Sequence, residues 1–441
     1  MVSPPNRTPV YSGKPLPRFG GQGACAVKCL YLHPDEFTLK STIAQELDAI
    51  GQKEGFPVRV QVGNQLYPPS QLQTVAPDTI EATTRWMQDG CQFIRKLNHK
   101  PSLLLSSTYQ DPPTIRDGVT LGKLLGFRTD SHDLHLEGGN IFIDRDSKGE
   151  TFALVGRDVY RNQEAYRRET LLERMISRFF SGSRGIVSSN VRCRDSIQKQ
   201  LSKLLGIPPK KIFYLSQPDF HLDMSIRPIN HPDILVHDGQ LSLQFLKEAF
   251  NASQDESEKQ KISQLLKETE QLQKSPEKEL FEAELITLER LMEKTDDPKK
   301  KKLLLGLYED VQSDQKRSVP KYASPDKMSS QLKATGLNPV KIPGVFGSLR
   351  NRTNYLNAIA HRKANGKLVY ITNASPLPFL DEQFKRYLLT QFPQIEACYF
   401  ITGGPSMLEK ERYFIQDCLE NRGGIHCLAL EQPDYGKYNL A

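Results

Sequence analysis

Hydrophobic and polar residues change their spacing repeatedly along this chain, and the changes predict strands that alternate with helices. Residues 23–32 and 56–63 read as strands, while residues 37–55 between them carry apolar side chains at helical spacing. Further strand patterns follow at 101–109, 149–156 and 209–217, and the alternation resumes after residue 338. The pattern predicts an α/β fold with short strands, without the glycine motif of a dinucleotide-binding fold after its first strand.

The segment from about residue 241 to 316 has a different texture from the rest of the chain. It is dense in Lys, Glu and Gln, and its apolar residues have helical spacing, as at Ile262, Leu265, Leu266 and Leu272. This texture predicts a helical insertion with a solvated charged face. The chain then divides into a flexible N-terminal segment, the first part of an α/β domain, the helical insertion and the remainder of the α/β domain, at 1–23, 24–239, 240–334 and 335–441.

Composition narrows the class of protein. The chain has 441 residues, 38% hydrophobic and 25% charged, with no apolar run long enough for a membrane span and no apolar signal segment at its start. We therefore expect a cytoplasmic protein without a membrane partner. The net charge of +7 is scattered and no nucleic-acid-binding motif is present, so we expect no nucleic-acid partner. Lysines and arginines would equally suit an acidic protein partner.

The cysteines do not form a disulfide framework or a zinc site. Their number is seven and their spacing is irregular, which favours reduced thiols. Cys25 and Cys29 stand near His33, but no second Cys/His pair completes a tetrahedral zinc set, so we expect these thiols to pack in the core.

Two short motifs in the first half of the chain place carboxylates beside structural markers. Asp89 ends the stretch "RWMQD", which holds the single tryptophan, and a carboxylate beside a well-packed wall can face a cation. Glu137 precedes two glycines in "LHLEGGNIFID", where glycine inside a strand pattern marks a bulge or the close approach of another group. Taken alone, each motif fits an ordinary turn.

Two motifs in the second half supply an imidazole, a further carboxylate and a thiol. His221 and Asp223 are two residues apart in "PDFHLDMSIRPI", and on a strand this spacing directs both side chains to one face. Cys427 follows a Gly-Gly pair in "NRGGIHCLALEQPD", which otherwise reads as a buried strand. On a strand the neighbouring His426 would point to the face opposite Cys427, so we assign proton transfer to His221.

Together these motifs match the chemistry of a guanidinium group. Carboxylates bind the planar cation through paired hydrogen bonds, a thiolate attacks its central carbon, and an imidazole moves protons.

In order and content, "WMQD", "LEGGN", "HLD" and "GGIHC" resemble the motifs of the guanidino-group-modifying, or pentein, superfamily, across about residues 80 to 430. "RWMQD" and the long helical segment look most like protein-arginine deiminases, whereas "LEGGN" and "GGIHC" look more like agmatine deiminases. Asp117 in "TIRDG" competes with Asp89 for the first aspartate. We prefer Asp89 because it lies 48 residues before Glu137 (137 − 89), whereas Asp117 lies only 20 before it (137 − 117).

The resemblance implies a five-bladed α/β propeller with a helical insertion and a hydrolase that deiminates a guanidinium. It implies that Asp89 and Asp223 bind the cation, Cys427 is the nucleophile, His221 transfers protons and Glu137 orients His221. Arg116 loosely matches an arginine that grips the substrate backbone. No cofactor is implied, and calcium activation is doubtful because Gly90 and Gln92 stand where calcium-dependent relatives have acidic ligands.

The resemblance favours arginine within a peptide or protein as substrate and leaves three alternatives open. The substrate could instead be agmatine or free arginine. An amidinotransferase would use an amine in place of water. A non-catalytic binding protein would keep the fold and act through the helical insertion.

Overall fold

The computed structural model describes residues 25–33, 36–75, 86–94, 100–106, 112–132, 136–146, 150–156, 190–217, 221–274, 325–348, 351–406, 412–420 and 423–434, with a few single residues between them. Their strands form five sheets of three or four strands and one of two strands, with helices around them. The predicted α/β fold is confirmed. Within the described part of the chain, no helix combines the length and the apolarity that a membrane span requires.

Five of the sheets repeat one arrangement. Two antiparallel strands are followed by a helical crossover and a third strand that runs parallel to the second. Four repeats contain β4 (Cys91–Ile94), β5 (Ser102–Leu105) and β6 (Arg128–Asp130); β7 (Ile141–Arg145), β8 (Thr151–Gly156) and β9 (Ile212–Leu215); β10 (Ile226–Asn230), β11 (Asp233–His237) and β12 (Asn338–Ile342); and β15 (Ile359–Arg362), β16 (Leu368–Asn373) and β17 (Ile395–Ile401).

The fifth repeat joins the two ends of the described chain. Its first strand is the C-terminal β18 (Ala429–Pro433), which pairs antiparallel with β1 (Val27–Leu32), and β1 pairs parallel with β2 (Val58–Val62). A fourth strand, β3 (Gln65–Tyr67), extends this sheet, while β13 (Val345–Phe346) and β14 (Thr353–Asn354) form the two-stranded one. The strands predicted over 23–32, 56–63 and 209–217 correspond to β1, β2 and β9.

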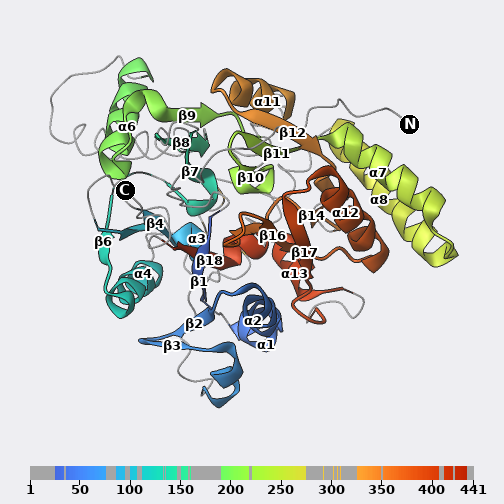
Figure 1. Cartoon of the computed structure of the whole chain (residues 1–441), viewed down its shortest axis with the longest axis horizontal. Coiled ribbons are helices and arrows are strands. Elements are labelled where there is room, and N and C mark those ends of the chain that lie inside the picture. Colours follow the sequence, from blue (N-terminus) through green and yellow to red (C-terminus); the bar gives the residue numbers. More distant parts are fainter. Residues whose placement is uncertain are drawn as a thin grey trace.

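Helices make the crossovers, and the longer ones bury apolar side chains against the sheets. They are α1 (Glu36–Lys40), α2 (Ile43–Glu54), α4 (Pro112–Leu125), α6 (Asn190–Leu205), α7 (Gly239–Ala252), α8 (Glu256–Lys274), α11 (Pro325–Ala334) and α12 (Pro378–Gln391). In α12, for example, Leu380, Phe384 and Leu388 recur every four residues and are buried. In Figure 1 the strands β4, β7, β10, β16 and β18, one from each of the five sheets, are grouped around the middle of the molecule, with α4, α6, α11 and α12 toward the outside.

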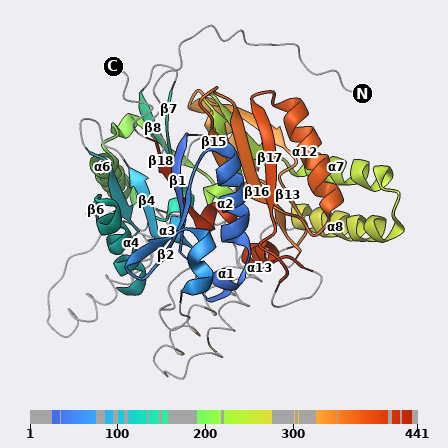
Figure 2. The ribbon, with the colours of Figure 1, turned by 60° about the horizontal axis from the view of Figure 1, so that its bottom comes forward.

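The described part of the predicted helical insertion is helical. α7 and α8 lie side by side at one edge of the molecule (Figure 2). Phe245 of α7 and Ile262 and Leu265 of α8 are buried in the same apolar core as Phe346 and Phe384. The inner faces of these two helices are therefore part of the main core. The domain boundaries at 1–23, 24–239, 240–334 and 335–441 stay predictions.

Short helical turns stand at three places where the sequence suggested strands: η3 (Gly138–Asn140), η5 (Leu222–Met224) and α14 (Ile425–Leu428). A further short turn, α3 (Met87–Gly90), carries the motif of Asp89. The strand predicted over 134–144 begins only at Ile141. His221 lies directly before the turn η5, and Asp223 lies within it. Cys427 lies on the short helix α14. α13 (Phe414–Glu420) and two further turns, η1 (Pro69–Thr74) and η4 (Pro209–Lys211), complete the elements of the described residues.

Candidate active site

The predicted site residues are brought together by the segments that lead into the first strand of each repeat. These segments are α3 before β4, η3 before β7, η5 before β10, residues 355–358 before β15 and α14 before β18. α3 lies against α14 and η3, and η3 lies against η5. Residues far apart in the sequence therefore meet in one place.

Glycines permit this close approach. A Cβ atom on Gly138 would lie 1.9 Å from the backbone oxygen of Gln88, and one on Gly423 would lie 2.2 Å from the Trp86 ring. A Cβ on Gly139 would lie 2.5 Å from His221 Nδ1. Only glycine leaves room for these contacts. The prediction that Gly138 and Gly139 mark a close approach is confirmed, although they lie in a turn before the strand.

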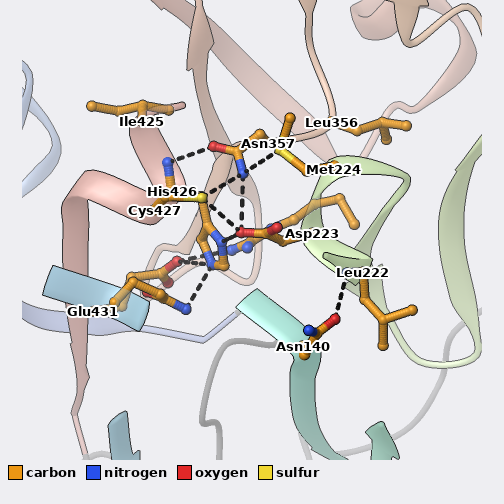
Figure 3. A network of polar contacts seen from close by, with 12 residues as sticks. Asn140, Leu222, Asp223, Met224, Leu356, Asn357, Ile425, His426, Cys427 and Glu431 are labelled. Carbon is orange, nitrogen blue, oxygen red and sulfur yellow. Dashed lines mark hydrogen bonds and ion pairs between the residues drawn. The ribbon is translucent and has the colours of Figure 1, made fainter. Parts of the chain in front are cut away.

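His221, Asp223 and Cys427 converge, as the motifs predicted. One ligand atom from each side chain lies within 4.8 Å of the others, and all three residues are buried. The Cys427 thiol donates a hydrogen bond to Asp223 Oδ2 at 3.4 Å (Figure 3). The imidazole, carboxylate and thiol have ligand types that a metal ion accepts, and the same atoms can bind and attack a planar organic cation.

Glu137 contacts the proton-transferring candidate. Its carboxylate forms an ion pair and hydrogen bond with Nε2 of His221. The Glu137 side chain keeps 18% of its surface exposed, against 2% for His221. This contact fixes the direction of the imidazole, as expected of a residue that orients His221.

Asparagines that the motif analysis gave no role hold these segments in position. Asn140 Oδ1 accepts hydrogen bonds from the Gln217 amide at 2.8 Å and from the Leu222 backbone at 3.2 Å, which fixes η5. Asn373 binds the backbone oxygen of Asn357 at 3.0 Å and accepts the Ile425 backbone amide at 2.7 Å. Buried amides of this kind join backbone segments that no sheet connects.

Asn357 contacts the chemical groups directly. Its Nδ2 donates to Asp223 Oδ2 at 3.0 Å and lies 3.3 Å from Cys427 Sγ, while its Oδ1 accepts the backbone N–H of His426 at 3.0 Å. One side chain thus links the carboxylate, the thiol and the helix that carries the thiol. Its signal in the sequence is a polar residue that ends the buried run "NYLN", shortly before a strand.

The expectation that His426 points away from Cys427 is wrong. Residues 425–428 form a helical turn, and the His426 ring is fully buried with Nδ1 2.7 Å from Asp223 Oδ2. Both His426 and Cys427 therefore contact the same carboxylate oxygen (Figure 3). Two consecutive side chains point to opposite faces only in an extended segment, and residues 425–428 are helical.

The two oxygens of Asp223 have different surroundings. Oδ2 accepts from His426, Asn357 and Cys427, whereas no hydrogen-bond donor among the described residues reaches the buried Oδ1. Burial acts to raise the pKa of Asp223, but the hydrogen bond and charge of His426, together with His221 and the hydrogen bond of Cys427, outweigh it, so the pKa lies below its usual value. A buried, ionised carboxylate with one open oxygen is suited to bind a cation.

Other predicted residues have different outcomes. The side chains of Asp89 and Arg116 lie outside the described residues, although their backbones belong to α3 and α4. The competing Asp117 pairs with His33 at 3.4 Å. Cys29 is buried, which raises the pKa of its thiol to about 11, and it stays protonated at neutral pH.

Comparisons with known proteins give a limited result. No protein-family model and no curated protein sequence matches the chain. Among solved structures, it is similar to an agmatine deiminase from C. jejuni, with a TM-score of 0.49 and 15% identity over 97% of this chain and 99% of that one. A substrate-bound variant of that enzyme has a TM-score of 0.47 and 14% identity over 97% and 99%.

A third similar structure is an arginine dihydrolase from cyanobacteria, with a TM-score of 0.33 and 11% identity over 92% of this chain and 39% of that chain. At TM-scores below 0.5 the function has to be argued from the geometry of the site.

Proposed function

We propose that this protein is a hydrolase of the guanidino-group-modifying superfamily that deiminates a guanidinium, and that its five repeats form a five-bladed α/β propeller. The observation that carries the proposal is the open oxygen of Asp223. It is a buried, ionised acceptor beside the Cys427 thiol and the His221 imidazole. A guanidinium supplies the N–H donor that this oxygen lacks, and places an electrophilic carbon beside the thiol.

In the resting site the thiol is a hydrogen-bond donor. Cys427 donates to Asp223 Oδ2 at 3.4 Å, and a thiolate there would face a carboxylate of the same charge. A bound guanidinium neutralises this repulsion, so substrate binding favours transfer of the thiol proton to His221. Asp89 would bind the opposite side of the cation, and Arg116 a more distant part of the substrate.

The reaction proceeds through one covalent intermediate. The thiolate forms a C–S bond to the central carbon, and His221 protonates the nitrogen that leaves as ammonia when its C–N bond breaks. The product of this step is a thiouronium on Cys427. His221 then takes a proton from water, the water oxygen adds to the same carbon, and the C–S bond breaks to give a ureido group and the free thiol. Glu137 holds His221 in direction throughout.

Two guanidino substrates are proposed, arginine within a peptide and agmatine. The groups described above contact the guanidinium end, which the two molecules share, so the remainder of the pocket determines the choice. An amidinotransferase would need an amine at the position of the water. A binding protein without turnover would not need a thiol and an imidazole at the open carboxylate oxygen.

The experiment is incubation under reducing conditions with an arginine peptide, agmatine or free arginine, with and without calcium, followed by mass spectrometry and an ammonia assay. We expect a mass gain of about 1 Da, the exchange of an imino group for oxygen, with release of one ammonia. Cys427→Ala should abolish turnover, whereas Cys398→Ala, which removes another buried thiol in β17, should retain it. Turnover by Cys427→Ala at the wild-type rate contradicts the mechanism, and wild-type protein inactive on all three substrates contradicts the proposal.

A further inference from the structure

His426 is a buried imidazole with a carboxylate oxygen beside each of its ring nitrogens. Nδ1 lies 2.7 Å from Asp223 Oδ2, and Nε2 lies 3.4 Å from Glu431 Oε1. A carboxylate oxygen accepts hydrogen bonds, so Nδ1 carries a proton and donates it to Asp223. Nε2 faces both Glu431 and the amide nitrogen of Gln88, which lies 3.3 Å away. The ring of Phe142 stacks on the imidazole, with centroids 6.1 Å apart.

The charges around His426 alternate in sign. Arg227 pairs with Glu431 at 3.0 Å, Glu431 faces His426, and His426 binds Asp223. None of these four side chains is exposed. Their formal charges cancel, so the protein can bury all four, whereas the loss of one would leave an uncompensated charge in the interior.

We propose that His426 is a positioning residue that holds the carboxylate of Asp223 for the substrate, an inference that rests on the proposed function. Its Nδ1–H occupies Oδ2 and thereby leaves Oδ1 for the guanidinium. Oδ1 lies on the side of the site where Gly139 and His221 meet. It is 3.1 Å from the position that a Cβ atom would take if Gly139 were replaced by a larger residue.

The contribution of His426 differs from that of Asn357, which binds the same oxygen. Asn357 supplies a neutral amide at 3.0 Å, and His426 supplies a charged donor at 2.7 Å. The hydrogen bonds of Asp223 and Glu431 raise the pKa of His426, against the opposing effects of burial and of Arg227. The imidazolium keeps Asp223 ionised before any substrate is bound, so the site is prepared for a cation.

Two substitutions of similar size separate positioning from packing. In His426→Asn the amide nitrogen takes the place of Nδ1 and can still donate to Asp223, whereas in His426→Gln it reaches the place of Nε2, toward Gln88 and Glu431. Both variants remove the positive charge. Adding Glu431→Gln to each removes one negative charge as well and restores neutrality of the network.

The measurement is agmatine binding by calorimetry in the Cys427→Ala background, where no turnover occurs. With Glu431→Gln present, we expect His426→Asn to bind within about threefold of the parent and His426→Gln to bind at least about tenfold more weakly, because a charged acceptor loses its fixed donor. Equal affinities of the Asn and Gln variants would overturn the positioning role.

The outcomes separate this inference from the proposed function. If the wild-type protein shows no turnover, hydrolysis is contradicted. If its Cys427→Ala form still binds agmatine, and adding His426→Gln removes that binding, the positioning role of His426 is supported. A Cys427→Ala form that binds neither agmatine nor an arginine peptide overturns both.

If the variants do not fold, NMR spectra of the wild-type protein with ¹⁵N-labelled histidine report the protonation of each ring nitrogen in its nine histidines. The inference requires a solvent-protected ring with protons on both nitrogens, and the absence of such a ring would overturn it.

Discussion

Replacing Gly139 by alanine should remove most of the activity without unfolding the protein. The new Cβ would lie 2.5 Å from His221 Nδ1 and 3.1 Å from Asp223 Oδ1. The imidazole would have to retreat by about 0.9 Å, the difference between 2.5 Å and the 3.4 Å at which ordinary contact begins. A displacement of about 1 Å in a reacting group costs roughly a hundredfold in rate, so we expect kcat/KM to fall by about that factor.

The structure offers a matched control for this substitution. Gly122, in α4, is equally tight: its Cβ would lie 2.5 Å from Thr129 Cγ2. Both variants should lose about 1–3 kcal/mol of unfolding free energy through overpacking, offset in Gly122→Ala by about 1 kcal/mol of helix propensity. Ammonia release and thermal unfolding are measured together. Wild-type kcat/KM in Gly139→Ala, or an equal loss in Gly122→Ala, would refute the reasoning.

Two further substitutions test the support of the site. Asn357→Ala should lower kcat/KM by about ten- to a hundredfold and lower the melting temperature, because Asp223 and Cys427 lose their shared donor; unchanged turnover would contradict this role. Glu268→Ala should destabilise the protein by about 1–3 kcal/mol at pH 7, because α8 loses its hydrogen bonds to Ser348. Burial opposes but does not outweigh these bonds, which lower the pKa of Glu268 below 4.5. Chemical denaturation should show that the difference from wild type is present above pH 4.5 and shrinks as the pH falls through the lowered pKa; a difference constant in acid would refute it.

The site residues that could be predicted from the sequence were those with reactive or charged side chains in short, recognisable motifs. His221, Asp223 and Cys427 stand in short motifs, and the structure gathers them. The strands β1 and β2 and the helix α2 follow from apolar spacing alone, since each buries one side or both in the core.

The network behind Asp223 was not predictable from local patterns. Arg227 and Glu431 each lie within an apolar strand. A charged residue in such a strand indicates a buried ion pair but does not identify the partner, and 204 positions separate these two residues. His426 was misplaced because an apolar run of four residues fits a helical turn as well as a strand, and periodicity cannot distinguish them at that length. The close packing of α14 on α3 and the asparagine bonds determine the helical turn only in the assembled fold.

The five repeats explain why such distant residues share one site. In each repeat the segment just before the first strand faces the same region, and each contributes one part: Gln88, Glu137, Asp223, Asn357 and Cys427 lie on or next to these five segments. Cys427, the proposed nucleophile, belongs to the repeat that β18 completes, because α14 leads directly into β18 and β18 pairs with β1. The position of Cys427 thus depends on pairing between the first and last described strands, and a change that weakened this pairing would displace the thiol from Asp223 before it disturbed the other four segments.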